Sequence, residues 1–287
     1  MTKEKSLLIA LFPNERKPHS ISIAKEICEF LTSKNVHTTA YEPYAKEIGA
    51  IPLLDIDVKE IDFMISLGGD GTILRLVHRY PKLDIPLLGI NLGNLGFMAD
   101  IPLHDIYPSL QDLLDGQYTV QSRLVMEGSS STGDHCMAVN EIVIHRGRNP
   151  CLIDLAIYVD GKYLNTFSAD GIIISTPNGS TAYSLAAGGP ILTPDLDVFV
   201  LTPICPHTLS NRPIVFMPKQ NIQIQYLSPL QPIEISYDGF SDFSLATNEI
   251  FTIYPSHNKF KLVSLSKQDY FSTLREKLGW QGKLKKI

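Results

Sequence analysis

The clearest chemical signal in the sequence is the run Gly68-Gly69-Asp70-Gly71-Thr72, which holds one carboxylate among three glycines. An apolar segment ends just before it and a helical pattern starts at its last residue, so the run is predicted to connect a strand to a helix. Glycines let backbone N–H groups approach a phosphate closely, and the following helix N-terminus favours an anion. A lone carboxylate repels a bare phosphate, so Asp70 is expected to hold a hydroxyl group or Mg²⁺ beside the phosphates. The alternative is that Asp70 only caps the helix and the glycines only form a tight turn.

A second signal is the segment Asp170–Pro190, which is rich in small and hydroxyl-bearing residues. The 24 residues of Gly171–Pro194 carry no charge and are long enough to cross a bilayer. Their three prolines, four glycines and seven hydroxyl side chains would leave too many polar groups unsatisfied in lipid. The segment instead favours a surface on which a nucleoside lies against the backbone, with a helix starting at Ser180 or Thr181. A small-residue helix packed on a sheet is the alternative, and it does not account for the hydroxyls.

Two weaker features complete the candidate set. Asn140-Glu141 opens a predicted strand and suits recognition of a sugar hydroxyl or a base edge, although the dipeptide is common. Gly89–Phe97 is a second glycine-rich strand exit, and Phe97 at its end either stacks on a base or belongs to the core. Its glycines lack G-x-G-x-x-G spacing, and the sequence contains no G-x-x-x-x-G-K-[ST] motif. The chain is therefore neither a P-loop NTPase nor a standard Rossmann dehydrogenase.

The elements that position these residues change character along the chain. In the first third, strands are predicted at 6–12, 36–41, 61–67 and 86–92, with helices at 20–31, capped by Ser20, and 72–80. This alternation favours an α/β N-terminal domain with a parallel, Rossmann-like sheet covered on both faces.

The second half of the sequence predicts many short strands, which favour an all-β, sandwich-like C-terminal domain. They are expected at 141–145, 152–159, 162–167, 172–175, 222–227, 233–237, 251–254 and 260–265. Asp160-Gly161 is a strong hairpin signal, and a final helical stripe ends near Gly279. We therefore predict an α/β domain over 1–120, a β-rich domain over 121–265, and a C-terminal helix in 266–287 that returns to the first domain.

The composition limits the classes of partner. The chain has 287 residues, with 25 Lys and Arg against 30 Asp and Glu, for a net charge of −5. This mild acidity argues against nucleic acid or an anionic membrane as the main partner. The cysteines lie far apart and no Cys/His cluster has metal-ligand spacing, so no fixed metal site is expected. The short apolar run near the N-terminus is neither a signal peptide nor an anchor, and a cytoplasmic protein is predicted.

Taken together, the chemical segments resemble the NAD kinase family. The resemblance rests, in order and spacing, on Gly68–Thr72, Asn91–Phe97, Asn140-Glu141, Asp170–Pro190, Pro206–Pro213 and Leu278-Gly279-Trp280. The first 60 residues match the family only in their strand–helix pattern. The Gly-Gly-Asp-Gly-Thr run is shared with phosphofructokinases and with diacylglycerol and sphingosine kinases. The segment T-P-N-G-S-T-A-Y at Thr176–Tyr183 is not shared with them, and it decides between these families.

The resemblance implies a two-domain enzyme with its site between the domains, assembled as a homodimer or homotetramer. Members transfer the γ-phosphoryl group of ATP, or in some cases of polyphosphate, to the 2′-hydroxyl of the adenosine ribose of NAD, giving NADP. ATP and NAD would be the small-molecule substrates and Mg²⁺ would accompany ATP. Neither a nucleic acid nor a membrane is an implied partner.

The family's functional residues can be carried onto matching positions. Asp70 would accept the 2′-hydroxyl proton, within a phosphate loop of Gly68, Gly69, Gly71 and Thr72. Asn140 and Glu141 would bind the adenosine half of NAD, with Phe97 near its adenine. Asp170 and Ala182 would contact the nicotinamide end. The NAD cleft would be lined by Thr181, Ala182, Tyr183, Ser184, Leu185 and Ala186. Arg75 would neutralise phosphate, or would be a solvated charge on the helix surface.

Two positions depart from the family pattern. Many members carry arginine where this chain has Ser168, which places a phosphate or ribose contact in question. Bacterial members often have a polar residue where this chain has Phe240, which places one edge of the pocket in question. Two rival functions stay open at this point: a lipid kinase sharing the glycine–aspartate loop, and a non-catalytic NAD(P)-binding regulator.

Overall fold

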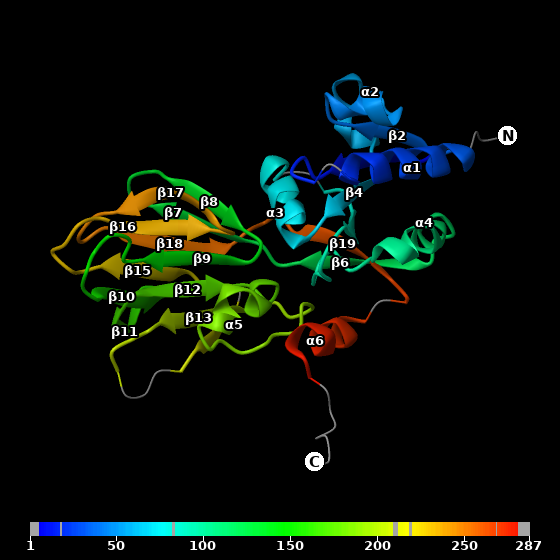
Figure 1. Cartoon of the computed structure of the whole chain (residues 1–287). Coiled ribbons are helices and arrows are strands. Elements are labelled where there is room, and N and C mark those ends of the chain that lie inside the picture. Colours follow the sequence, from blue (N-terminus) through cyan, green and yellow to red (C-terminus); the bar gives the residue numbers. More distant parts are fainter. Residues whose placement is uncertain are drawn as a thin grey trace, which may run out of the picture. The chain divides into compact units, whose positions relative to one another are not determined.

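The structure is a computed structural model that describes residues 6–17, 19–81, 84–208, 212–217, 220–267 and 269–280, without the side chains of 241 and 242. It consists of two compact units (Figure 1). Unit 1 comprises Met1–Gln121 and Lys261–Ile287, and unit 2 comprises Ser122–Phe260. Within the described residues, no helix is long and apolar enough to cross a membrane.

Unit 1 is built on a seven-stranded sheet in the order β3-β2-β1-β4-β5-β19-β6. Its strands are β1 (Leu8–Pro13), β2 (His37–Ala40), β3 (Ile51–Pro52), β4 (Phe63–Gly68), β5 (Leu87–Asn91), β6 (Tyr118–Arg123) and β19 (Phe260–Leu265). The pairs from β3 through β19 are parallel, which confirms the predicted α/β domain. Because β1, β4 and β5 are adjacent and parallel, the loops that follow them leave the sheet at one edge.

The helices of unit 1 are α1 (His19–Ser33), α2 (Tyr44–Ile48), α3 (Asp70–Arg79), α4 (Ile106–Leu114) and α6 (Tyr270–Leu278). The apolar spacing of α1 puts Ala24, Ile27 and Leu31 into the core with the strands. Ser20 does not cap this helix as predicted. It lies inside α1, fully buried, and its hydroxyl donates to the Asn14 carbonyl at 2.8 Å.

Unit 2 is an antiparallel β-sandwich of two six-stranded sheets, ordered β11-β10-β15-β18-β7-β8 and β14-β13-β12-β9-β16-β17. The strands are β7 (Met126–Ser130), β8 (His135–Ala138), β9 (Glu141–His145), β10 (Ile153–Val159), β11 (Lys162–Ala169), β12 (Gly171–Ser175), β13 (Phe199–Ile204), β14 (Ile214–Phe216), β15 (Ile222–Tyr226), β16 (Ile233–Tyr237), β17 (Phe240–Leu245) and β18 (Ile250–Pro255). Alternate residues of both sheets, such as Ile142 and Ile144 of β9 and Leu155 of β10, fill one shared core. This confirms the predicted sandwich.

One strand differs from its predicted assignment. Phe260–Leu265 was expected in the β-rich domain, but it is β19 of the parallel sheet, where Leu262 pairs with Leu87. Val263 and Leu265 are buried in the core of unit 1. A short apolar run suits either type of sheet, so its periodicity does not specify its partner strands.

Candidate active site

The Asp70 carboxylate is bound by three successive backbone N–H groups. Oδ2 accepts the N–H of Phe97 at 2.8 Å, and Oδ1 accepts those of Met98 at 3.0 Å and Ala99 at 2.8 Å. Asp70 is the first residue of α3, and the side-chain bond at the start of that helix comes from Thr72, whose Oγ1 accepts the Gly69 N–H at 3.4 Å. The alternative that Asp70 only caps the helix is therefore wrong. The carboxylate joins the glycine loop after β4 to the loop after β5, and Oδ2 has one bond fewer than Oδ1.

The fit around this carboxylate requires glycine at position 96. A Cβ atom there would overlap Asp70 Oδ1 and lie 2.9 Å from the Ala99 carbonyl. On the other side of the loop, Thr72 Oγ1 accepts the Asn14 side-chain amide at 3.0 Å and Arg75 Nη2 at 3.3 Å. The loops after β1, β4 and β5 are thus bonded to one another at the carboxyl edge of the sheet.

Three basic side chains lie at these loops: Arg16 and Lys17 follow β1, and Arg75 is on α3. Lys17 Nζ is 3.4 Å from the Leu92 carbonyl, and Arg75 donates to Thr72 although its side chain is largely exposed. Burial and the nearby Arg16 charge lower the pKa of Arg75, with Glu15 acting in the opposite direction. Arg16 and Lys17 were missed by sequence reasoning. Their position directly after the first strand could have indicated them, because the loops that follow parallel strands lie at the same edge of the sheet.

Phe97 is held by the C-terminal helix. Its ring centroid lies 6.1 Å from that of Tyr270, and Lys277 Nζ lies 5.2 Å from its centroid. Lys277 Nζ also donates to the Leu95 carbonyl at 2.6 Å. The helix α6 therefore packs on the loop after β5, and Phe97 is half-buried there.

In unit 2, the backbone around Asn140 and Glu141 is hydrogen-bonded by residues of two other segments, Asp238 and Thr176. The carboxylate of Asp238 accepts the N–H groups of Val139, Asn140 and Glu141 at 2.8, 2.8 and 3.2 Å. Thr176 donates its hydroxyl to the Val139 carbonyl at 2.5 Å and its N–H to the Asn140 carbonyl at 2.9 Å. Among the residues that the structure describes, Asn140 Oδ1 and Glu141 Oε2 are nevertheless buried without a hydrogen-bond partner. Buried polar atoms of this kind need an explanation, and a ligand supplies one.

The Glu141 side chain is 8% exposed, and its surroundings disfavour its charged form. Burial and the Asp238 charge raise the pKa of Glu141 to about 8, whereas the Tyr183 N–H acts to lower it. At neutral pH this carboxyl therefore carries a proton for most of the time.

Asp170 is paired with an arginine that the sequence did not single out. The Arg146 side-chain Nε lies 2.7 Å from Asp170 Oδ1. The backbone N–H of Arg146 donates to the backbone carbonyl of Asp170 at 2.9 Å. Ser168, the first departure noted in the sequence, donates its hydroxyl to Asp154. A guanidinium thus reaches Asp170 from the end of β9. The ring of Phe240, the second departure, lies 6.0 Å from that of Tyr237.

The segment Thr181–Ala186 contains exposed and buried members. It forms a 3₁₀ turn, Gly179–Thr181, and the short helix α5 (Tyr183–Ala186), in place of one longer helix. Tyr183 and Ala186 are exposed, and Thr181, Ala182 and Leu185 are half-buried. Ser184 is fully buried and shares a 3.0 Å hydrogen bond with Thr202 of β13. Its hydroxyl anchors α5, which differs from the lining role expected of it.

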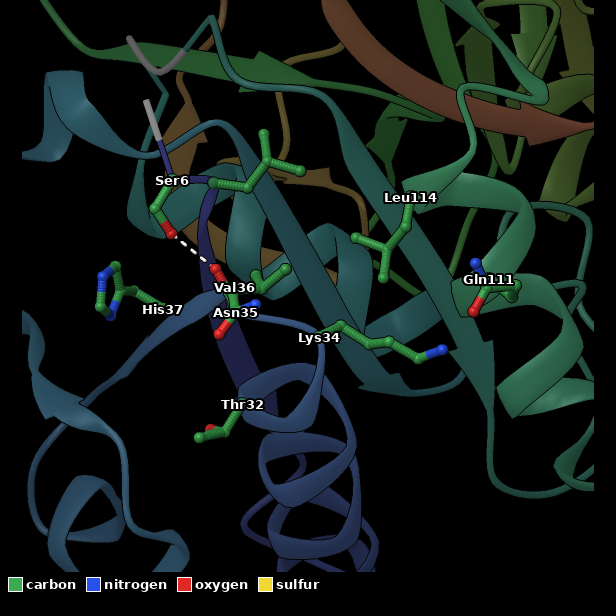
Figure 2. A pocket seen from close by; sticks show the side chains of 9 residues that line it. Ser6, Thr32, Lys34, Asn35, Val36, His37, Gln111 and Leu114 are labelled. Atoms are coloured by element: carbon green, nitrogen blue, oxygen red, sulfur yellow. Dashed lines mark hydrogen bonds between the residues drawn. The ribbon is translucent and has the colours of Figure 1, made fainter. Parts of the chain in front are cut away.

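The structure also contains a groove that holds none of the predicted residues (Figure 2). It is lined by Ser6, Leu7, Thr32, Lys34, Asn35, Val36, His37, Gln111 and Leu114, with a volume of about 780 Å³. Lys34 and His37 point in different directions in Figure 2. The groove adjoins the starts of β1 and β2, whereas ligands of open α/β sheets bind at the carboxyl ends. It is therefore not the candidate site.

Comparison with known proteins gives matches over both units. The N-terminal domain model of ATP-NAD kinases matches residues 9–118, and the C-terminal domain model matches residues 139–265. The NAD kinase of Protochlamydia amoebophila is 66% identical over 278 residues, covering 97% of this chain and 100% of that protein. The NAD kinase of Geotalea daltonii is 38% identical over 278 residues, covering 95% and 98%.

Two solved structures share the fold. The crystal structure of yeast NADH kinase complexed with NADH has a TM-score of 0.88 at 26% identity, covering 99% of this chain and 91% of that one. An NAD kinase from Archaeoglobus fulgidus in complex with ATP has a TM-score of 0.73 at 26% identity, covering 95% and 98%. The matched domains are those of a kinase, and so the chain is an enzyme that transfers a phosphoryl group. It belongs to the NAD kinase family, which confirms the resemblance seen in the sequence.

Proposed function

We propose that the chain transfers the γ-phosphoryl group of ATP to the 2′-hydroxyl of the adenosine ribose of NAD, giving NADP and ADP. The observation that carries this proposal is the Asp70 carboxylate, fixed by three N–H groups within the glycine loops. The related yeast structure holds NADH and the related Archaeoglobus structure holds ATP, which supports both substrates.

In this mechanism Asp70 acts as the base. The free lone pair of Oδ2 takes the proton of the 2′-hydroxyl while the bond from O2′ to the γ-phosphorus forms and the bond from that phosphorus to the β,γ-bridging oxygen breaks. Base catalysis of this kind contributes about 10²–10⁴-fold. A carboxylate suffices because the transition state of phosphoryl transfer is loose. The N–H bonds hold the carboxylate in one orientation, so little reorganisation is needed during reaction.

The nucleoside is assigned to the unpartnered atoms of unit 2. Asn140 Oδ1 and Glu141 Oε2 would bond the adenosine half of NAD, since both are buried with no partner in the described part of the chain. Asp170 and Ala182 would contact the nicotinamide end, with the exposed parts of Thr181–Ala186 lining the cleft. Phe97 would lie near the adenine.

Mg²⁺ is proposed to arrive with ATP. Among the described residues, no three His, Cys, Asp or Glu side chains gather closely enough to hold a metal ion. Mg²⁺ binds through substrate phosphates with one or two carboxylates, and Asp70 offers one carboxylate, so the residues fit this arrangement. When bound, the ion would neutralise phosphate charge.

The three cations of the loops would bind the phosphates of ATP. We expect Lys17→Gln to raise the KM for ATP about tenfold while the KM for NAD changes less than threefold, because one charge-assisted contact to phosphate is lost. Steady-state kinetics with each substrate varied in turn measures this. Lys25→Gln, an exposed position on α1, is the matched control. Equal effects on both substrates would contradict the assignment.

The proposed reaction is tested by NADP formation from NAD and Mg²⁺-ATP, coupled to an NADP-specific dehydrogenase, with polyphosphate as a parallel donor. We expect turnover with ATP. Folded protein that binds NAD but gives no NADP with either donor would favour a non-catalytic regulator. Turnover of diacylglycerol or sphingosine without turnover of NAD would favour a lipid kinase.

We further propose that the enzyme is a cytoplasmic homodimer or homotetramer without nucleic-acid or membrane partners. The family resemblance supports this, and self-association is also supported by apolar side chains exposed on the edge strands β11 and β14, among them Tyr163 and Val215. Light scattering on the purified chain measures the oligomeric state.

A further inference from the structure

The turn between β16 and β17 carries the carboxylate that binds the start of β9. Asp238 accepts three successive N–H groups, from Val139 to Glu141, and its own N–H donates to the Glu141 carbonyl at 3.1 Å. These partners lie 97 to 99 residues away in sequence. The segment that presents Asn140 and Glu141 is therefore fixed by a residue of another hairpin.

A second Asp-Gly hairpin shows which of these bonds the turn itself requires. Asp160 and Asp238 both have left-handed φ angles, 49° and 48°, and each is followed by a glycine with positive φ. Asp160 Oδ1 accepts one N–H, from Asn221 at 2.9 Å, and its own N–H donates to the Asn221 carbonyl at 3.0 Å. The additional N–H bonds of Asp238 thus serve the segment of Asn140 and not the hairpin.

We propose that Asp238 is a positioning residue that holds Asn140 and Glu141 in their ligand-binding conformation. The inference rests on the proposed function, because the nucleoside of NAD is the ligand that this pair would bind. In its protonated form Glu141 offers an O–H donor, and Asn140 Oδ1 offers an acceptor; a nucleoside has hydroxyl and base-edge groups that can pair with either.

The groups around Glu141 support this protonation state. Burial has the largest effect, and the Asp238 charge adds to it, so that the pKa of Glu141 rises to about 8. The α5 helix contributes the Tyr183 N–H, which acts in the opposite direction, and Ser175 of β12 pairs with Glu141 in the strand register. NAD affinity should therefore fall as the pH rises through about 8, where Glu141 loses its proton.

The first test is Asp238→Asn. Asparagine keeps one oxygen for the N–H groups of Asn140 and Glu141, but it turns an NH₂ group toward the Val139 N–H, and Asn-Gly is as good a hairpin turn as Asp-Gly. We expect the KM for NAD to rise at least about tenfold with kcat within about threefold. The pH at which NAD affinity begins to fall should decrease, because the charge that raises the pKa of Glu141 is removed. Asp160→Asn, the same change in the matched turn, should alter neither quantity.

The second test is Glu141→Gln, whose amide is neutral at every pH. We expect the NAD affinity of this variant, measured by calorimetry, to be flat between pH 7 and 9.5. The wild-type affinity should fall about tenfold per pH unit above the pKa of Glu141. This test does not depend on the folding of Asp238→Asn.

The outcomes separate this inference from the proposed function. Wild-type protein that neither binds NAD nor forms NADP would contradict the proposed function and, with it, the inference. Wild-type activity together with an unchanged KM for NAD in Asp238→Asn would overturn the positioning role alone. Wild-type affinity that stays constant to pH 9.5 would overturn the neutral form of Glu141.

Discussion

Replacing Asp70 with asparagine is expected to lower kcat at least about a hundredfold while NAD affinity changes only a few-fold. The amide cannot accept the proton of the 2′-hydroxyl. It can still accept the N–H groups of Met98 and Ala99 with its oxygen, and only the bond to Phe97 is lost. Single-turnover NADP formation and NAD calorimetry measure the two quantities.

The control for this variant is Asp57→Asn. Asp57 is exposed and its carboxylate accepts the Lys59 N–H at 3.0 Å, so the same chemical change is made at a carboxylate bonded to backbone outside the loops. We expect its kcat to equal that of the wild type. An Asp70→Asn enzyme with kcat within tenfold of the wild type would contradict the role of Asp70 as base.

Gly96→Ala tests whether activity depends on the position of the Asp70 carboxylate as well as on its presence. The new Cβ would take the space of Asp70 Oδ1, so the carboxylate must move although it remains in the protein. This variant should lose activity as well, and the loss in the double variant with Asp70→Asn should be less than the product of the single losses, because both act on one group. Multiplicative losses would show that the two residues act independently.

The local elements were predictable because short-range patterns determine them. The strands Glu141–His145 and Ile233–Tyr237 have the predicted bounds, and the C-terminal helix ends at Gly279, whose φ of 64° is a left-handed cap. The partners of a strand depend on contacts far along the chain. For this reason Phe260–Leu265 was predicted as a strand but placed in the wrong sheet.

The chemical residues were predictable by type, but their partners were not. Asp70 stands out among glycines, yet its bonds go to backbone N–H groups 27 to 29 residues away, and N–H groups leave no mark in a sequence. Asp238 likewise looks like an ordinary turn residue. The ion pair of Arg146 with Asp170 depends on the register of β9 against β12, in which Gly171 lies opposite His145.

The second large effect is expected from Gly179→Ala. A Cβ at this position would overlap the carbonyl of Asn140 and lie 2.7 Å from Ser175 Oγ. Backbone cannot yield as a flexible side chain does, so the 3₁₀ turn and the start of β9 must separate. We expect the free energy of unfolding to fall by about 1–3 kcal/mol. The KM for NAD should rise at least about tenfold, because Asn140 and Glu141 move with that carbonyl, while kcat changes little.

Gly71→Ala is the matched control for the stability of this variant. Gly71 lies in α3, and a Cβ there meets nothing within 4 Å, so alanine should keep or slightly raise the free energy of unfolding, because alanine favours a helix over glycine by about 1 kcal/mol. Urea unfolding of both variants measures this difference. The two substitutions add the same methyl group, so their effects on folding differ through the contacts with the Asn140 carbonyl and Ser175 and through the helix propensity gained at Gly71. Equal stability of the two variants would therefore mean that the segment of Thr176–Tyr183 does not pack on the start of β9, and that the support for the nucleoside site lies elsewhere.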